Sequence, residues 1–415
     1  MMLGDLVPNE IPKPIFTLAE RDRRWSVVRQ NMEREGLDAL IAPATQEQGD
    51  VLYLTQLGGR TREAWAIFPQ DSKKPVLALV ESNRVKSFWL GMQNWLGEEN
   101  FRIASANISE SIVQGISELG LEKGRLGIAQ LTGVRFNPEG LIPFTTFDRI
   151  RNALPQAEFI ATDLLHRLRM CKSQEEIEAI RKIVTVNEQA ILTLIEAARR
   201  GAKKQADLWY PTYISLFLGT GELPTRLSMA LDKGGNSTLG TPTSDIVSEG
   251  QILSEEIAAD YQGYRAQVNH SLFIGSSRVA GFDYYKKALE TATKTFDGMV
   301  EAIRPGKTTT GQLMSRYLEI ATEQGAEPPG GVLLHSSGIG SQRPRVGPAN
   351  KEDMDIVLQP GMTFDLKPTL VMRPDVIRDV RANSRSVQIG DHVLVTDSRA
   401  VRLGKRELRP IATAD

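Results

Sequence analysis

The chain of 415 residues is too long for one ordinary hydrophobic core, so its length predicts two domains. Hydrophobic residues make up 41% of it and charged residues 24%, proportions that argue against a disordered or fibrous protein. Fifty basic and 51 acidic residues leave a net charge of −1, so no overall field favours nucleic acid or an anionic membrane. A small substrate or a protein partner is the better expectation.

Cysteine usage and the distribution of apolar residues bear on the compartment. The single cysteine, Cys171, cannot form an internal disulfide, which is compatible with a reducing cytosol. No window approaches the roughly 20 apolar residues that a membrane span requires. Residues 1–14 lack the basic and apolar pattern of a signal peptide. We therefore expect a cytoplasmic protein that does not contact a membrane.

In the first part of the chain, helical and strand-like patterns alternate. Apolar residues recur at helical spacing over residues 18–35 and 109–119, and each segment leads into a short apolar run. Two further apolar runs flank a polar turn, as the strands of a hairpin do. The predicted strands cover residues 37–42, 64–68, 75–80 and 125–129. The pattern predicts a mixed α/β domain over residues 1–165.

A second domain, over residues 166–415, is predicted to begin with a long helix. Ser173 precedes Glu175 and Glu176 and then an extended helical pattern, which is typical of a capped helix N-terminus. Strand-like runs follow, then two helical segments separated at Arg304-Pro305-Gly306, and then strands again. The predicted strands cover residues 245–259, 270–274, 362–366 and 392–395, and the predicted helices cover 284–303 and 310–323. This order predicts an α+β domain whose helices cover one face of a curved sheet.

Five short stretches of the second domain occur in an order that resembles the signature blocks of the creatinase/aminopeptidase P/methionine aminopeptidase family. They are Lys172-Ser173-x-x-Glu176, Gly263-Tyr264 followed by Phe273-x-Gly275, Pro305-Gly306, Ser337-Gly338-Ile339-Gly340, and Gln359-Pro360-Gly361-Met362 before Lys367-Pro368. Each block is weak alone, but the ordered set is specific. The resemblance implies the family's pita-bread fold, preceded by its smaller α/β creatinase-type N-terminal domain.

The resemblance also implies which residues stand where family members hold two metal ions with two aspartates, one histidine and two glutamates. These positions are Glu256, Gln267, Ser337, Lys367 and Gly390, and none matches the usual ligand. The usual ligands carry a charge of about −4, which two divalent cations neutralise, whereas Glu256 and Lys367 sum to zero. A lysine at such a site also repels incoming cations. We therefore predict a site that works without metal ions or another cofactor.

Four residues form the predicted catalytic set. We expect Glu256 to act as general base if a dry pocket raises its pKa, and Lys367 to polarise a carbonyl or to transfer protons. Gln267 is included because the resemblance assigns it, like Glu256 and Lys367, to a metal-ligand position of the family. His270 is included because it lies three residues later, in the strand that edges the family's site, although a lone histidine is more often structural.

Four further residues are predicted to contact the substrate, namely His335, Ser337, Arg345 and Tyr264. Arg345 follows the Gly-Ile-Gly turn and could clamp a carboxylate with two nitrogens. Tyr264 belongs to a Gly-Tyr pair that the family keeps, so a packing role also suits it. Creatinase-like enzymes place a catalytic histidine in the segment that corresponds to residues 234–242, and this chain has none there.

Three functions remain open at this stage. The first is a metal-independent hydrolase or lyase that acts on C–N or related bonds of a small amide, guanidino or amino-acid-like substrate. Creatinase is the family's precedent for such metal-free C–N hydrolysis. The second is a non-catalytic pita-bread binding protein, and the third is a Xaa-Pro dipeptidase-like metallopeptidase, against which the ligand positions argue. Because two-domain relatives commonly pair, the resemblance implies a homodimer.

Overall fold

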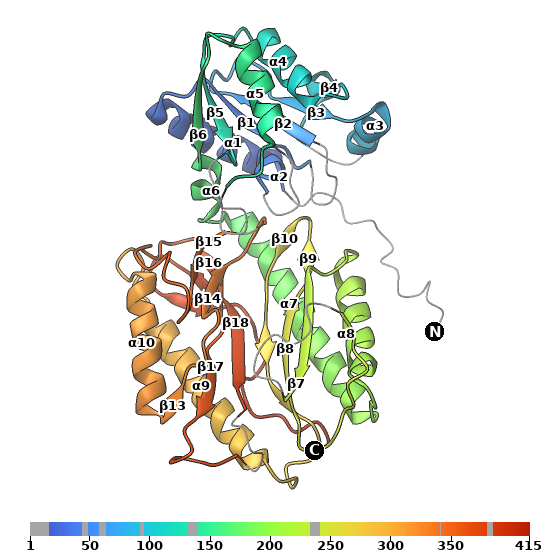
Figure 1. Ribbon diagram of the computed structural model, residues 1–415, viewed down its shortest axis with the longest axis vertical. Coiled ribbons are helices and arrows are strands. Elements are labelled where there is room, and N and C mark those ends of the chain that lie inside the picture. The colour runs from blue at the N-terminus through green and yellow to red at the C-terminus, as the bar shows by residue number, and fades with distance from the viewer. Residues whose placement is uncertain are drawn as a thin grey trace. The chain divides into compact units, whose positions relative to one another are not determined.

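The computed structural model describes residues 16–43, 49–57, 64–91, 95–131, 139–232, 241–340, 342–379 and 385–415 (Figure 1). These residues fall into two compact units. The N-terminal unit contains the described residues up to Arg169 together with Ile339 and Gly340, and the C-terminal unit contains the others from Met170 onward. Of the helices in the described ranges, none combines the length and the apolar character that crossing a membrane demands.

The N-terminal unit is built on a mixed β-sheet. Its elements are α1 (Leu18–Glu35), β1 (Ala39–Ala42), α2 (Asp50–Thr55), β2 (Ala64–Pro69), β3 (Leu77–Val80), α3 (Asn83–Gly91), the 3₁₀ helix η2 (Glu98–Asn100), β4 (Phe101–Ile103), α4 (Ile108–Glu118), β5 (Arg125–Ala129), α5 (Phe144–Ala153), β6 (Glu158–Thr162) and α6 (Leu164–Arg169). The strand order is β4-β3-β2-β1-β5-β6, and β2 runs antiparallel to both neighbours while the other pairs are parallel. Aliphatic side chains of these strands and of α4 and α5 form its core.

The C-terminal unit contains four long helices and mainly antiparallel strands. Its elements are α7 (Gln174–Arg199), α8 (Gln205–Thr220), β7 (Arg226–Leu231), β8 (Ile252–Ala258), β9 (Asp260–Tyr261), β10 (Tyr264–Arg265), β11 (Asn269–His270), β12 (Leu272–Phe273), α9 (Phe282–Ala302), α10 (Thr310–Glu323), β13 (Ala326–Glu327), β14 (Leu334–Ser336), β15 (Gln342–Val346), β16 (Thr363–Leu366), β17 (Thr369–Met372), β18 (Val387–Val395) and β19 (Ala400–Arg402).

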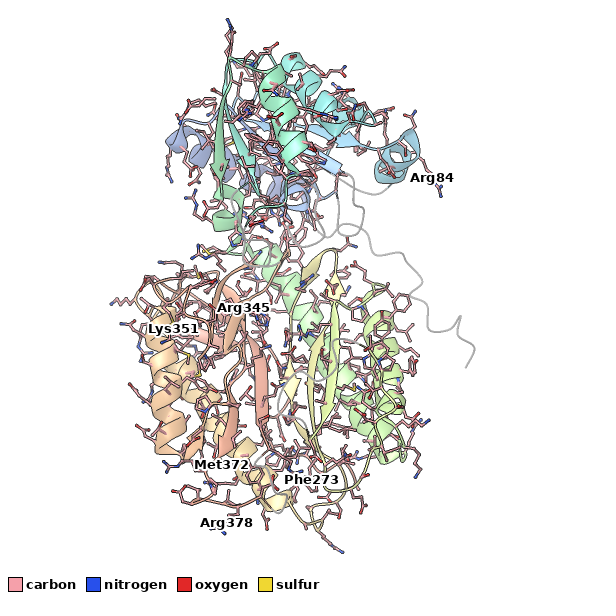
Figure 2. All side chains as sticks on the ribbon, viewed as in Figure 1. Arg84, Phe273, Arg345, Lys351, Met372 and Arg378 are labelled. Carbon is pink, nitrogen blue, oxygen red and sulfur yellow. The ribbon has the colours of Figure 1, made fainter. Side chains whose placement is uncertain are left out.

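The long strand β18 organises this unit, because it pairs antiparallel with β11, β16, β17 and β19. A second sheet has the order β12-β8-β7, and a bridge between Ile257 and Val268 joins its β8 to the segment that enters β11. Helices α7 and α8 lie beside β8 and β7, whereas α9 and α10 lie beside β17 and β13 (Figure 1). Phe273 and Met372, both labelled in Figure 2, are fully buried in the apolar core.

The structure confirms the predicted α+β class and most of the predicted elements. Helices α1 and α10 have the predicted bounds. Helix α7 starts where its cap was predicted, because the Ser173 hydroxyl accepts the Glu176 N–H and the Glu176 carboxylate accepts the Ser173 N–H. The sequence pattern did not predict α8, whose interior contains Pro211 and whose apolar residues surround the helix rather than follow one face.

Candidate functional site

Glu256 and Lys367 lie in contact within the C-terminal unit. Glu256 lies on β8, and Lys367 directly follows β16. Lys367 Nζ donates a hydrogen bond to Glu256 Oε1 over 2.6 Å, and the two side chains are 8% and 9% exposed. Charges that leave water must be paired, and these two neutralise each other as the sequence predicts.

A second cation, Arg226, lies on the other side of the Glu256 carboxylate. Its Nε is 2.5 Å from Glu256 Oε2. Burial alone would raise the pKa of Glu256, but the attraction of Lys367 and Arg226 outweighs burial and lowers this pKa to about 2. The expectation of a general base with a raised pKa is therefore wrong, because a carboxylate held by two cations is a very weak base.

Gln267, His335 and Asp365 form the other half of the site. His335 Nε2 lies 3.1 Å from Gln267 Oε1 and 3.4 Å from Asp365 Oδ2, and Lys367 Nζ lies 3.7 Å from the same Asp365 oxygen. Loss of water contact and the nearby Lys367 cation lower the pKa of His335, so its imidazole is neutral at pH 7. Burial raises the pKa of Asp365 to about 8 against the opposing effect of Lys367.

Strand register places these side chains on one face of the sheet. His335 of β14 stands directly opposite Asp365 of β16, which stands opposite His392 of β18. Directly opposite residues point to the same side of a sheet, and so do residues two apart on one strand. Lys367 therefore points to the same side as Asp365, and the side chains of His335, Asp365 and Lys367 converge.

The glycine at position 390 makes room for Lys367. A Cβ atom on Gly390 would lie 2.8 Å from Lys367 Cβ and 2.7 Å from Asn269 Oδ1. Such contacts are too short for unstrained packing. The space that a side chain at position 390 would fill is thus used by the lysine stem and Asn269.

His270 does not join this group, which corrects the prediction that it belongs to the catalytic set. It lies three residues after Gln267, an odd separation that turns its side chain to the opposite side of the strand. Its ring Nε2 is 2.9 Å from the Arg409 carbonyl oxygen, and its backbone N–H donates to Glu255 Oε1 over 2.6 Å. Burial and the nearby Arg406 cation lower the pKa of His270 to about 3, so the ring is a neutral structural group.

The other predicted substrate contacts are placed as follows. The Tyr264 hydroxyl donates to Glu176 Oε1 on α7 over 2.8 Å, which is a packing role. Ser337 is buried, and its carbonyl oxygen accepts from the Thr363 hydroxyl. Arg345 of β15, labelled in Figure 2, stands opposite His335. Its backbone N–H donates a hydrogen bond to Asp353 Oδ2. Most of the segment 234–242, where no histidine occurs, lies outside the described residues.

Two parts of the chain match known protein families. Residues 174–397 match metallopeptidase family M24, and residues 24–171 match the creatinase/prolidase N-terminal domain. The first match covers more than half of the chain. The chain belongs to metallopeptidase family M24. Its C-terminal unit is therefore the M24 pita-bread domain, and its N-terminal unit is the smaller creatinase-type domain, as the signature blocks predict.

Named relatives in family M24 are hydrolases. A Xaa-Pro dipeptidase of Pyrococcus furiosus is 25% identical over 65% of this chain and 73% of its own length. A creatinase of a Bacillus species is 24% identical over 88% of this chain and 87% of its own length. Among solved structures, a prolidase from Thermococcus sibiricus superposes with a TM-score of 0.72 at 19% identity, over 94% of this chain and 99% of that one. This last likeness concerns the fold.

The residues that the resemblance assigns to the M24 metal positions do not fit a pair of divalent cations. Gln267 and Ser337 are neutral, Gly390 offers no side chain, and the Lys367 ammonium already occupies one oxygen of Glu256. Within the described ranges, no group of three or more histidine, cysteine, aspartate or glutamate side chains is arranged to hold a metal ion. Divalent cations prefer several carboxylate or imidazole ligands, and a fixed ammonium opposes their entry.

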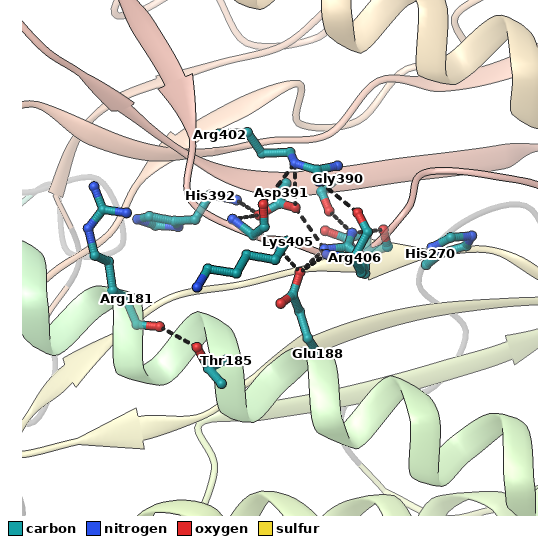
Figure 3. A network of polar contacts seen from close by, with 12 residues as sticks. Arg181, Thr185, Glu188, His270, Gly390, Asp391, His392, Arg402, Lys405 and Arg406 are labelled. Atoms are coloured by element: carbon teal, nitrogen blue, oxygen red, sulfur yellow. Dashed lines mark hydrogen bonds and ion pairs between the residues drawn. The ribbon is translucent and has the colours of Figure 1, made fainter.

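A separate ion-pair network surrounds Asp391 and Arg406 (Figure 3). Asp391 is adjacent to His392, which stands opposite Asp365, so its side chain points to the other side of β18. Arg406 Nη1 contacts Asp391 Oδ2 at 2.8 Å, and its Nη2 donates to the carbonyl oxygens of Asn269 and Gly390 over 3.0 and 2.5 Å. Glu188 of α7 accepts the backbone N–H groups of Lys405 and Arg406. The network ties the segment after β19 to β11, β18 and α7, and so holds Gly390 and Asn269 in place behind the site.

Sequence reasoning missed two members of the site, Arg226 and Asp365. Asp365 could have been found, because it lies two residues before Lys367 on a predicted strand and so shares its face. Arg226 lies near the start of a strand that the sequence pattern did not predict, and its contact with Glu256 depends on the pairing of β7 with β8. Only the folded chain brings this arginine to the carboxylate.

Proposed function

We propose that this protein is a metal-independent hydrolase that cleaves a C–N bond of a small amide, guanidino or amino-acid-like substrate. The observation that carries the proposal is the Lys367–Glu256 ion pair. It supports a metal-free site because the resemblance to family M24 implies that relatives hold metal ions at these two positions. The single cysteine suits a reducing cytosol, and the two-domain relatives suit a homodimer, so we further propose a cytoplasmic homodimer.

In this proposal, Lys367 and His335 divide the chemistry. The Lys367 ammonium stabilises the negative charge that develops on the substrate oxygen or nitrogen when water adds, as a preorganised donor does. Neutral His335 takes one proton from that water while the new C–O bond forms. The C–N bond then breaks, and the proton passes from His335 to the leaving nitrogen. Glu256 and Asp365 lie close enough to stabilise the transient imidazolium.

The same groups would support a lyase reaction on a different substrate. If His335 removed a proton from the carbon next to the one that bears the leaving nitrogen, the C–N bond would break and a carbon–carbon double bond would form. Lys367 would again stabilise the developing charge. Products distinguish the two reactions, because hydrolysis consumes water and elimination does not.

Two other functions have a specific observation in their favour. The names of the relatives favour a Xaa-Pro dipeptidase-like metallopeptidase, but the residues that the resemblance assigns to the metal positions oppose it. The contacts of Glu256 with two cations favour a non-catalytic binding protein, because a carboxylate held in this way does not readily accept a proton. Asp365 keeps the hydrolase ahead, since it lies beside Lys367 and its pKa of about 8 lets it exchange a proton near neutral pH.

Activity and metal content test the proposal together. We would assay the purified protein on N-acyl amino acids, guanidino acids and Xaa-Pro dipeptides, with and without a strong chelator. We expect hydrolysis that survives the chelator, and a loss of at least about 100-fold in kcat/KM for Lys367→Ala. Lys351→Ala removes an exposed lysine of the same unit and should leave activity unchanged.

Three outcomes would overturn the proposal. Activity that disappears with the chelator and returns with manganese, cobalt or zinc would support a metallopeptidase instead. Stoichiometric metal by elemental analysis of the untreated protein would do the same. Tight binding of a substrate class without turnover, equal in wild type and Lys367→Ala, would favour a binding protein.

A further inference from the structure

His392 is a buried polar side chain that the proposed reaction does not use. It lies on β18 and is labelled in Figure 3. Among the residues that the structure describes, neither of its ring nitrogens takes part in a hydrogen bond. Burial and the nearby Lys172 cation lower the pKa of the ring to about 3, so the imidazole is neutral and carries one N–H. A buried imidazole in this state costs stability unless its donor and its acceptor find partners.

Strand register brings the carboxyl group of Asp365 to His392. The two residues stand directly opposite each other in the antiparallel pairing of β16 with β18. Their side chains therefore point to the same side of the sheet, and Cβ atoms in such a pair are about 4.5–5.5 Å apart. His335 stands opposite Asp365 on the other neighbouring strand, β14. The three side chains form one row across three strands, with the carboxyl group in the middle.

Asp365 and His392 are suited to share one water molecule. Within the described ranges, the two carboxyl oxygens of Asp365 and the two ring nitrogens of His392 all lack a hydrogen bond, so no direct bond joins the pair. Polar groups that face each other beyond direct reach are commonly bridged by water, and a buried water makes about three hydrogen bonds. Lys172 does not take this place, because its ammonium donates to Gln342 Oε1 and to the Met170 carbonyl oxygen.

We propose that a buried water joins His392 to Asp365, and that His392 is in this way a positioning residue for the Asp365 carboxyl group. The inference rests on the proposed function for the part that Asp365 plays in the reaction. The ring N–H of His392 donates to the water, and the water donates to Asp365 Oδ1. This leaves Asp365 Oδ2 towards His335 Nε2 and Lys367 Nζ, which lie 3.4 and 3.7 Å away. His392 itself touches no substrate.

Crystallography of the full chain tests the water without any need for turnover. We expect ordered density within roughly 2.7–3.2 Å of both Asp365 and a ring nitrogen of His392. In His392→Phe, or in His392→Leu if the larger ring prevents folding, the water should be lost and the Asp365 carboxyl group should turn. At least one of His392→Asn and His392→Gln should keep the water, because their amides reproduce the polar atom at Nδ1 or at Nε2.

His270→Gln provides the matched control for the crystal structures. It changes another fully buried histidine, outside the row, and should leave the Asp365 carboxyl group in place. A direct hydrogen bond between His392 and Asp365, no density between them, or an unmoved carboxyl group in His392→Phe and His392→Leu would each overturn the inference.

Kinetics separate a positioning role from a purely structural one. His392→Phe should lower kcat about 10-fold to 100-fold with little change in KM, and the amide variant that keeps the water should recover most of the loss. In an Asp365→Asn background the same substitution should have little further effect, because His392 acts through Asp365. An equal loss in both backgrounds would overturn the inference. A bridging water and a carboxyl group that turns without it, in a protein that hydrolyses no substrate, would keep the contact and refute only the proposed reaction.

Discussion

The two ion-pair networks on opposite sides of β18 differ in how fully the protein satisfies them. Arg406 has four protein oxygens around its guanidinium, from Asp391, Glu188, Asn269 and Gly390. On the other side, within the described part of the chain, neither carboxyl oxygen of Asp365 takes part in a hydrogen bond. In the Arg406 network, Arg406 Nε also lacks a hydrogen bond among the described residues, but both oxygens of Asp391 accept one. The buried carboxyl group is therefore satisfied by the protein in the Arg406 network and is not satisfied in the Lys367 network.

This difference suggests that the Arg406 network serves mainly the stability of the fold and that the Lys367 network serves function. Native proteins satisfy nearly all buried polar atoms, so an exception requires an explanation. Unsatisfied polar groups that converge on one face cost stability and are retained where a ligand completes them. We therefore expect substitutions in the Arg406 network to affect folding first, and substitutions around Lys367 to affect activity first.

The largest effect should come from the Arg406 network. Arg406→Ala removes the nearer of two arginine partners of Asp391, which is fully buried, and leaves only Arg402 Nε at 3.6 Å to compensate its charge. We expect the free energy of unfolding to fall by about 3–5 kcal/mol, measured by urea denaturation. Arg316→Ala, in an exposed pair within α10, should change it by less than about 0.5 kcal/mol. A small effect of Arg406→Ala on the free energy of unfolding would mean that the Arg406 network does not contribute more to stability than the Lys367 network.

The pH dependence of stability should sharpen the contrast. The pKa of Glu256 is about 2 in the folded state against an ordinary value of 4.5, so the folded state holds its proton less tightly than the unfolded chain. The ion pairs of Glu256 therefore stabilise the fold above pH 4.5, by about 3 kcal/mol, and this contribution is lost as the pH falls from 4.5 to 2.

Denaturation of wild type and Glu256→Gln between pH 7 and pH 2 measures this contribution. The variant should be less stable at pH 7, and the difference between the two proteins should shrink towards pH 2, because glutamine does not titrate. A constant difference across this range would show that Glu256 is not held by charge.

Local sequence signals predicted those parts of the fold that local chemistry determines. The bounds of α10 were predicted from the break at Pro305-Gly306 and the helical pattern that follows it, and in the structure the Thr309 hydroxyl caps the helix by accepting the N–H of Gln312. Helix α8 was missed because it is apolar around most of its circumference, and neither the helical nor the strand period stands out in such a segment.

The sequence predicted those site residues that the ordered signature blocks align with the family. The contact of Glu256 with Lys367 follows from the family frame, and the structure confirms it. His270 was placed in the site by proximity in sequence, but strand alternation turns it to the Arg406 side. The condition under which Glu256 would act as a base, a raised pKa, is not met, because Lys367 and Arg226 together lower that pKa. The contribution of Arg226 could not be foreseen, since only strand register brings it to Glu256.

The smallest stability effect, and the most informative, concerns Asp365. Burial raises its pKa to about 8 from an ordinary value of 3.8, so the folded state binds the proton more tightly than the unfolded chain does. The fold therefore loses stability as the pH rises from about 4 to about 8, and a side chain of the same shape that cannot ionise avoids that loss. Asp365→Asn should raise the free energy of unfolding at pH 8 by about 1–3 kcal/mol.

The same substitution should impair function, because asparagine cannot exchange a proton with His335 or stabilise its imidazolium. A variant that unfolds at higher urea concentration but turns over substrate at least about 10-fold more slowly is the signature of a group kept for activity at the expense of stability. The Arg406 network predicts the reverse, since its variants should lose stability while the folded fraction stays active. Should Asp365→Asn destabilise the protein as Arg406→Ala does, both sides of β18 would be structural, and the catalytic assignment would have to move away from the Lys367 network.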